Sequence, residues 1–301
     1  MLRTCRQPCA NPKTDRAVTS LSRAAVMLTI VTSLGPSMTF AASRPSLCAP
    51  DTPQVRIADL SIAAMRLEAA ACGLVDYCRS PARRGAARAA VASSVNGQIV
   101  SICASDRRIK ALFDEADILH CDGEPLVKLS RLLAAAPFPE RVATTDLFPA
   151  VARRAAAAGA SFYMLGATPQ VNRLAVARTQ AAFPDLRIVG AHHGYFTRPE
   201  EPAIVAEIAR LAPDIVWVAL GAPLEQEFCL RHRDALASVG VLKTAGGLFE
   251  FLSGAVPRAP VWMREAGLEW LFRMSVDPRR LFLRYLVTNP HALYVTLKTA
   301  R

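Results

Sequence analysis

The sequence predicts an α/β fold in which a mostly parallel sheet carries helices on both of its faces. Short apolar runs, such as ASFYMLGA at 160–167 and DIVWVALG at 214–221, have the composition of strands buried on both faces. Amphipathic segments with apolar residues at helical spacing separate these runs along the chain. Because parallel strands need long crossover connections, this alternation predicts strands joined by helices.

The first expected elements follow a separate N-terminal segment. Residues 1–53 are rich in Pro, Ser and Arg and are expected to lie outside the fold. Periodicity then predicts a helix over 56–78, a basic loop or helix over 82–92, a buried strand over 97–104, a helix over 106–119, and a turn followed by a helix over 120–135.

The later elements alternate more regularly. The pattern predicts a strand over 160–167, a helix over 169–183, a strand and loop over 186–196, a helix over 202–213, a strand over 214–223, a helix over 224–237, and a strand, glycine turn and helix over 239–254. The predicted fold is therefore a Rossmann-like α/β domain over 54–255 with a C-terminal helical appendage over 256–301.

Glycine-containing loops follow several expected strands, at the edge where an open parallel sheet binds ligands. Several of them precede a helix, whose first N–H groups can hold phosphate. Any one such glycine more commonly just ends a strand, but five loops on one edge indicate a binding site. These loops are 121–123, 166–168, 192–195, 221–223 and 246–247.

The sequence lacks the motifs of several enzyme classes. No GxGxxG follows an expected strand, which disfavours dinucleotide redox chemistry, and no GxxxxGK[ST] is present, which excludes a P-loop NTPase. The GxSxG nucleophile elbow is also missing. The absence of any Asp-x-Asp weakens the case for a divalent metal held by paired carboxylates.

The formal net charge of +11 is concentrated at the two ends of the chain. Residues 1–45 contain six Lys or Arg and one Asp, and residues 258–301 contain eight Lys or Arg and three acidic residues. Nucleic-acid binders more often carry their basic charge on the folded domain, so no nucleic-acid partner is expected. Basic ends on a near-neutral body suit an anionic membrane surface or a phosphate-bearing ligand.

The N-terminal segment and the cysteines give conflicting indications of location. The apolar run at 24–42 follows basic residues and ends in small ones, which fits a secretory signal, a single membrane anchor or a wrongly assigned start codon. The eight cysteines form no CxxC pair and have no His partners at zinc-like spacing. They are expected to be reduced thiols of a cytoplasmic protein.

Four segments carry a more specific pattern: ADILHCDG at 116–123, AAFPDLRIVGAHHGYF at 181–196, PDIVWVALGAP at 213–223, and GGLFEFLSGAVPRAPVWMREAGLEWLFRMSVDPRRLFLRYL at 246–286. In these segments the chain resembles the WecG/TagA/CpsF family of bacterial glycosyltransferases, over roughly residues 55–295. The resemblance implies transfer of an N-acetylhexosamine, of N-acetylmannosamine type, from a UDP-sugar to an undecaprenyl-diphosphate-linked sugar. It further implies an inverting reaction without metal or cofactor, in surface or exopolysaccharide biosynthesis.

The resemblance assigns roles to individual positions. Asp122, in Cys-Asp-Gly, resembles the family's proposed general base, which removes the proton of the attacking acceptor hydroxyl. An Asp before Gly is otherwise commonly a turn residue. His192 and His193 are expected to serve packing or donor contact rather than metal binding. The expected donor-binding residues are Gly166, Gly194, Tyr195, Pro223, Gln226 and Gly246.

Three places depart from the family's pattern within the expected site. Glu225 stands where the family usually has Gln after its Gly-x-Pro loop, and Gln226 follows one residue later. The family's Thr-Pro-Asn is placed near residues 102–104 (Ile-Cys-Ala), so an amide is expected to be missing. Residues 144–146 (Thr-Thr-Asp) replace Gly-Ser-Asp. These changes leave the donor sugar and the acceptor open.

The C-terminal segment combines arginines with the aromatic residues found at membrane interfaces, such as Trp262 and Trp270. On one continuous helix, Arg273, Arg280 and Arg284 would lie within about 40° of one another, although Asp277-Pro278 is expected to interrupt that helix. Arginine suits a diphosphate because of its planar, charged donors. A solvated basic helix is the alternative. The expected phosphate- or lipid-binding residues are Arg258, Arg273, Arg280 and Arg284.

The expected partners are a UDP-sugar donor, a polyprenyl-diphosphate-linked acceptor and the membrane surface, with self-association into a homo-oligomer as a property that the family often shows. Because UDP-sugars are cytoplasmic, the expected location is the cytoplasmic face of the bacterial inner membrane, either peripheral or N-terminally anchored. One alternative is a catalytically altered sugar-nucleotide-binding protein on the same scaffold. Another is a nicotinamide-dependent oxidoreductase, which lacks its phosphate-binding fingerprint.

Overall fold

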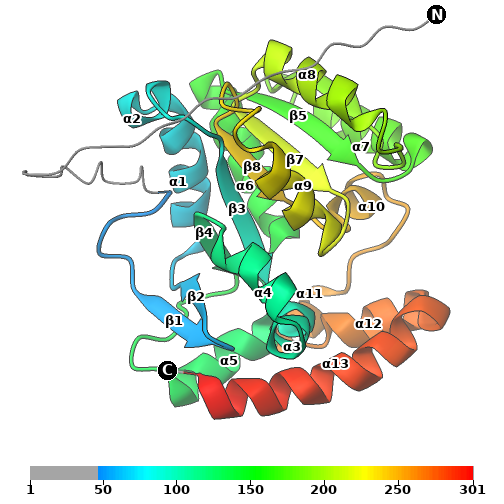
Figure 1. The fold of residues 1–301 in the computed structure, drawn as a ribbon. Coiled ribbons are helices and arrows are strands. Elements are labelled where there is room, and N and C mark those ends of the chain that lie inside the picture. The colour runs from blue at the N-terminus through cyan, green and yellow to red at the C-terminus, as the bar shows by residue number, and fades with distance from the viewer. Residues whose placement is uncertain (1–46, 301) are drawn as a thin grey trace, which may run out of the picture. The chain divides into compact units, whose positions relative to one another are not determined.

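The computed structural model describes residues 47–300 of the 301-residue chain. One sheet contains the eight strands of these residues: β1 (Gln54–Ile57), β2 (Leu60–Ala63), β3 (Ala90–Val95), β4 (Ile118–Cys121), β5 (Ser161–Gly166), β6 (Arg187–His192), β7 (Ile215–Ala219) and β8 (Val241–Thr244). Their order is β1-β2-β4-β3-β8-β7-β5-β6 (Figure 1). β1 and β2 pair antiparallel, and the other neighbouring pairs of the described sheet run parallel.

Helices cover both faces of this sheet, which confirms the predicted α/β class (Figure 1). Their bounds are α1 Leu67–Arg79, α2 Pro81–Arg84, α3 Gly97–Ser105, α4 Arg107–Asp114, α5 Glu124–Leu133, α6 Thr144–Ala158, α7 Pro169–Ala182, α8 Glu201–Leu211, α9 Leu224–His232, α10 Leu248–Leu252, α11 Val261–Ala266, α12 Glu269–Val276 and α13 Pro278–Thr299. α1, α6, α7 and α10 pack on one face. On the other face α8 and α9 form one cluster, and α3, α4, α5 and α13 form another with β1 and β2.

Strand β7 shows why the apolar runs predicted strands correctly. Ile215 and Trp217 point into the core on one face, whereas Val216 and Val218 point into the core on the other. The Trp217 ring lies edge-on to Phe148 of α6, with ring centroids 4.8 Å apart. A strand buried on both faces therefore needs a continuous apolar sequence rather than an alternating one.

The prediction of a strand over 97–104 is wrong. Residues 97–105 form helix α3, and the strand is Ala90–Val95, which begins at the end of the segment 82–92 expected to be a basic loop or helix. The Asn96 side chain starts the helix by accepting the N–H of Ile99 at 3.2 Å. Ile99 and Cys103 then fall on one buried helical face. The strand itself is built from small residues, which carry a weak β signal.

Three further short strands lie wholly or partly in segments that were assigned to helices. The predicted helix over 56–78 is a hairpin of β1 and β2 followed by α1, with the turn residues Ala58 and Asp59 at φ 52° and 57°. The predicted helix over 106–119 ends at Asp114 and is followed by strand β4. Four-residue strands contain too few positions to establish a period in sequence.

The C-terminal helices pack against the α/β body. α12 ends before Asp277 and α13 begins at Pro278, so the expected interruption of the helix is confirmed. Ala292 and Val295 of α13 enter the same apolar cluster as Ile99 of α3. That residues 256–301 form a separate appendage stays a prediction. Among residues 47–300, no helix has both the length and the hydropathy needed to cross a membrane. The apolar run at 24–42 lies outside the described residues.

Gly166 allows β5 to end in close contact with β7. Its φ is +140°, and a Cβ atom there would lie 2.3 Å from the carbonyl oxygen of Ala219. Both features exclude a larger residue without movement of the backbone. This glycine is therefore required by the junction of the two strands.

Gly166→Ala is expected to lower the free energy of unfolding by about 2 to 4 kcal/mol, because of the strained φ and the overlap with β7. Gly85→Ala is the matched control, since a Cβ there meets nothing within 4 Å. Its effect should stay within about 0.5 kcal/mol. Urea denaturation followed by circular dichroism measures both, and equal effects of the two substitutions would contradict this reading of Gly166.

Candidate active site

A cavity of about 520 Å³ lies at the carboxyl ends of β3, β4, β7 and β8. Residues that follow these strands line it together with residues of α12 and α13. This is the edge at which the glycine loops predicted a ligand site. The carboxylate and arginine side chains that line the cavity are Asp122, Glu124, Arg141, Glu225, Glu269, Arg273 and Arg284.

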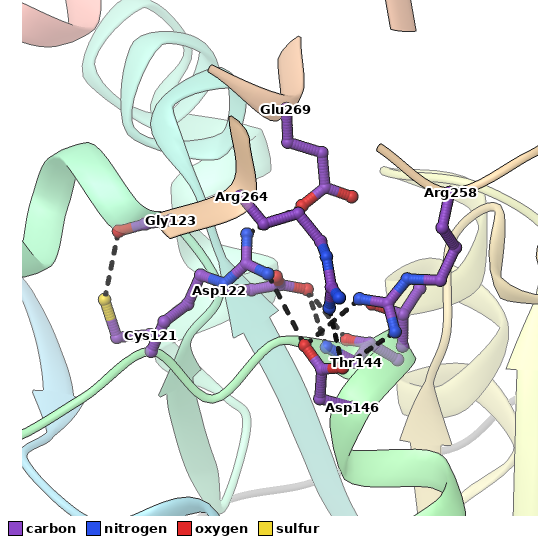
Figure 2. A network of polar contacts seen from close by, with 10 residues as sticks. Cys121, Asp122, Gly123, Thr144, Asp146, Arg258, Arg264 and Glu269 are labelled. Carbon is purple, nitrogen blue, oxygen red and sulfur yellow. Dashed lines mark hydrogen bonds and ion pairs between the residues drawn. The ribbon is translucent and has the colours of Figure 1, made fainter. Parts of the chain in front are cut away.

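Asp122 follows β4 and lines this cavity. Its Oδ2 atom accepts two hydrogen bonds from Thr144, one from the backbone N–H at 3.1 Å and one from the hydroxyl at 2.9 Å (Figure 2). Burial raises the pKa of Asp122, against the opposing effects of Arg141, the Thr144 hydrogen bonds and Lys243. A carboxylate held in this way can accept a proton from a ligand bound in the cavity.

Arg141 connects Asp122 to the C-terminal segment. Its guanidinium lines the cavity and forms an ion pair of 2.8 Å with Glu269, at the start of α12. It also lies 3.4 Å from the carboxylate of Asp146. One cation is therefore shared among carboxylates from the loop after β4, from α6 and from α12.

Asp146 is the centre of a cluster of arginines at the N-terminus of α6 (Figure 2). Arg258 donates to its two carboxylate oxygens at 2.7 and 3.2 Å, and Arg264 lies 3.6 Å away. Burial acts to raise the pKa of Asp146, but Arg258, Arg141 and Arg264 outweigh it and hold this pKa below its ordinary value. Asp146 is therefore ionised at neutral pH and ties the segment after α10 to the body.

The predicted phosphate-binding arginines occupy different places. Arg273 on α12 and Arg284 on α13 both line the cavity, although they lie on separate helices. The Arg284 guanidinium lies 4.9 Å from the centre of the Tyr285 ring, and its Nε atom is buried without a hydrogen-bond partner in the described chain. Arg258 forms an ion pair with Asp146 and does not line the cavity. The side chain of Arg280 is outside the described part of the structure.

Glu225 joins two of the glycine loops. Its Oε2 atom accepts the N–H of Gly221 at 3.1 Å and the N–H of Gly246 at 2.9 Å. Gln226 donates to Ser93 at 3.0 Å and lines the cavity, as Gly246 also does. Burial raises the pKa of Glu225 against these N–H bonds. Glu225 therefore places a carboxylate where it fixes the rim itself.

The other predicted donor-binding residues lie outside the lining of this cavity. Gly166 belongs to the β5–β7 junction, and Gly194 packs against it and donates its N–H to Ala167 at 2.7 Å. Tyr195 is 74% exposed, and Pro223 precedes α9. Their assignment to the donor stays a prediction.

Several lining residues were not singled out from the sequence. Residues 102–104 lie inside α3, so the first loop of the rim is at Asn96, directly after β3. The side-chain amide of Asn96 belongs to this loop, and Asn96 lines the cavity. The sequence feature that could have identified this loop is the Asn-Gly pair at 96–97, which follows a strand of small residues. Arg141 and Glu269 gave no such signal, because their roles depend on partners distant in sequence.

The cysteines and possible metal ligands bear on two expectations from the sequence. None of the six cysteines within residues 47–300 forms a disulfide bond. In the same part of the chain, no group of three or more His, Cys, Asp or Glu side chains is placed to hold a metal ion.

Comparison with known families agrees with the resemblance seen in the sequence. The model of the glycosyl transferase WecG/TagA/CpsF family matches residues 55–301. The match extends from the first strand through the cavity-lining loops to the last helix. The chain therefore belongs to the WecG/TagA/CpsF family of glycosyltransferases.

Proposed function

We propose that the protein transfers an N-acetylhexosamine, of N-acetylmannosamine type, from a UDP-sugar to an undecaprenyl-diphosphate-linked sugar in surface or exopolysaccharide biosynthesis. The observation that carries the proposal is a carboxylate, Asp122, in a cavity that Arg273 and Arg284 also line. A sugar nucleotide and a lipid diphosphate are both anionic through phosphate, which arginine recognises well.

The proposed reaction assigns one step to each group. Asp122 removes the proton of the acceptor hydroxyl while the hydroxyl oxygen attacks the anomeric carbon of the donor. The bond between that carbon and the diphosphate oxygen breaks, and UDP leaves with the bonding electrons. Attack from the face opposite the leaving group inverts the anomeric centre. Arg273 and Arg284 stabilise the charge that develops on the leaving diphosphate or hold the diphosphate of the acceptor.

The exposed side of α13 supports a membrane-bound acceptor. Helical spacing places Leu281 and Val295 in the core, while the other side forms an exposed surface, the apolar face of α13. Exposed apolar patches of this kind mark interaction sites. Basic residues of the same helix, such as Arg284 and Lys298, favour binding to anionic lipid. We place the protein on the cytoplasmic face of the inner membrane. The apolar face of α13 comprises Phe282, Leu283, Leu286, Val287, Leu293, Tyr294 and Leu297.

The first prediction concerns Asp122. Transfer from a panel of UDP-N-acetylhexosamines to a short-chain lipid-diphosphate-GlcNAc analogue is measured in EDTA with the full chain. Asp122→Asn should reduce kcat by about 10²- to 10⁴-fold, because it removes the general base. Asp76→Asn, which changes an exposed carboxylate on α1, is the matched control and should remain active.

The pH dependence follows from the same residue. Since burial raises the pKa of Asp122, the acidic limb of kcat should lie above the pH at which an ordinary aspartate titrates. Activity is lost as the pH falls through that raised pKa, because the protonated acid accepts no proton. A folded wild-type chain that releases UDP from no donor in the panel would instead support the sugar-nucleotide-binding alternative.

The second prediction concerns the arginines. Arg273→Gln and Arg284→Gln should each reduce kcat/KM by about 10- to 100-fold, the value of a charge-assisted hydrogen bond. Arg173→Gln on the exposed surface of α7 serves as the control. Separate titration of donor and acceptor shows which diphosphate each arginine holds. Unchanged kinetics in both variants would remove these arginines from the site.

The third prediction concerns the membrane. The double variant Leu283→Ser and Val287→Ser should bind vesicles of anionic phospholipid about 10- to 100-fold more weakly, because less apolar area is buried in lipid. Co-sedimentation with the vesicles measures this affinity. Leu174→Ser, which changes an exposed leucine of α7, is the matched control. Equal binding of the double variant and the wild type would assign the apolar face of α13 to a different contact.

A further inference from the structure

Lys243 is a cation enclosed by the centre of the protein. It belongs to β8, between β3 and β7, and its side chain is completely buried. Its Nζ atom donates to the hydroxyl of Ser94 at 2.9 Å and to the carbonyl oxygen of Thr244 at 2.8 Å. Burial of an ammonium group is costly unless it is paired or hydrogen-bonded. An apolar residue would fill a central strand at lower cost, so the lysine calls for a functional explanation.

A chain of hydrogen bonds leads from Lys243 to Asp122. Ser94 and Thr144 hydroxyl oxygens lie 3.1 Å apart, and the Thr144 hydroxyl lies 2.9 Å from Oδ2 of Asp122. Ser94, Thr144 and Asp122 line the cavity, whereas Lys243 lies behind them, outside the lining. The hydrogen-bond path from the lysine to the carboxylate of Asp122 therefore runs through the two hydroxyl groups.

The chemistry of the two ends fixes the direction of this chain. An ammonium group can only donate and an ionised carboxylate can only accept. Thr144 must therefore use its single hydroxyl proton toward Asp122, and it accepts from Ser94. Ser94 in turn accepts from Lys243 and donates to Thr144. All three bonds point toward the carboxylate in one arrangement, and such chains strengthen one another in an enclosed environment.

The surrounding charges agree with this direction. Burial lowers the pKa of Lys243 to about 8, against the raising effects of Asp122 and Glu225. Burial lowers the pKa of His120 to about 3, so this neighbour is neutral near pH 7. The titratable groups that act on Asp122 and Lys243 are Arg141, His120, Glu225 and Cys229. Of these, Arg141 is the other cation beside Asp122.

We propose that Lys243 is a positioning residue for the transfer reaction: through Ser94 and Thr144 it orients the carboxylate of Asp122 and keeps it ionised, while Lys243 retains its proton and touches no substrate. This inference rests on the proposed role of Asp122 as general base. It goes beyond the proposed role of Asp122, because it states that the reaction also needs a buried cation on β8.

The test compares pH profiles of Lys243→Met in the full chain with those of the wild type. Methionine keeps the length of the side chain without charge or donor. We expect kcat at pH 7 to fall by about 10- to 100-fold, with KM for donor and acceptor unchanged. The acidic limb of kcat should move to higher pH, because the charge that lowers the pKa of Asp122 is lost. At alkaline pH the two profiles should converge, because Lys243 is then neutral in the wild type as well.

Two controls separate this role from a structural one. Val241→Ala creates a cavity in the same buried strand without touching the hydrogen-bond chain, and it should lower the melting temperature while the acidic limb stays in place. Ser94→Ala breaks the chain at its first link and should move the limb in the same direction as Lys243→Met. A Lys243→Met protein that is folded but keeps the wild-type limb would overturn the proposal.

The base assignment and the lysine proposal can fail separately. If Asp122→Asn retains full activity, the base assignment fails and with it the premise of this inference. If Asp122→Asn is inactive but Lys243→Met has the wild-type pH profile, the inference about Lys243 fails alone. Should Lys243→Met fail to fold, Ser94→Ala decides the question, since it leaves Lys243 hydrogen-bonded to Thr244.

Discussion

The rest of the site depends on one constraint, the burial of the Asp122 carboxylate. Burial disfavours its charged form, which the proposed reaction needs, and isolated buried carboxylates become protonated instead. Arg141, Thr144 and Lys243 counter this effect, and they come from the loop before α6, from α6 itself and from β8. The central strand order β4-β3-β8 brings these distant segments to one carboxylate. The parallel sheet is therefore part of the electrostatics of the site.

A second balance of charge attaches the C-terminal segment. Arg141, Arg258 and Arg264 would repel one another without the carboxylates of Asp146 and Glu269 between them. Exposed ion pairs contribute little to stability, but a partly buried network with shared partners contributes more. Because Glu269 begins α12, this pairing also helps to place the rest of α12 beside the cavity. The contacts that attach the C-terminal segment to the body therefore also hold Arg273 at the cavity.

The sequence predicted the later half of the fold better than the first, for physical reasons. β5 and β7 are continuous apolar runs, whereas β3 consists of alanine, serine and valine and resembles a loop by composition. Asp122 could be found because it lies in a recognisable Cys-Asp-Gly motif, although the strand before it was not predicted. Lys243 could not, since its proposed role depends on Ser94, Thr144 and Asp122, which are distant from it in the sequence. Arg258 was expected at a phosphate, but its guanidinium is held by Asp146.

The two sides of α13 are arranged as the proposed lipid-linked acceptor would require. Tyr285 and Ala292 line the cavity and pack toward the body, whereas Leu283 and Val287 point outward on the same helix. One turn of helix advances about 5.4 Å, so residues for both environments alternate within each turn. An acceptor with its diphosphate at Arg284 would thus have its prenyl chain beside an apolar surface without crossing polar protein. In the proposed function, a helix that packs on one side and contacts lipid on the other supplies this continuity without spanning the membrane.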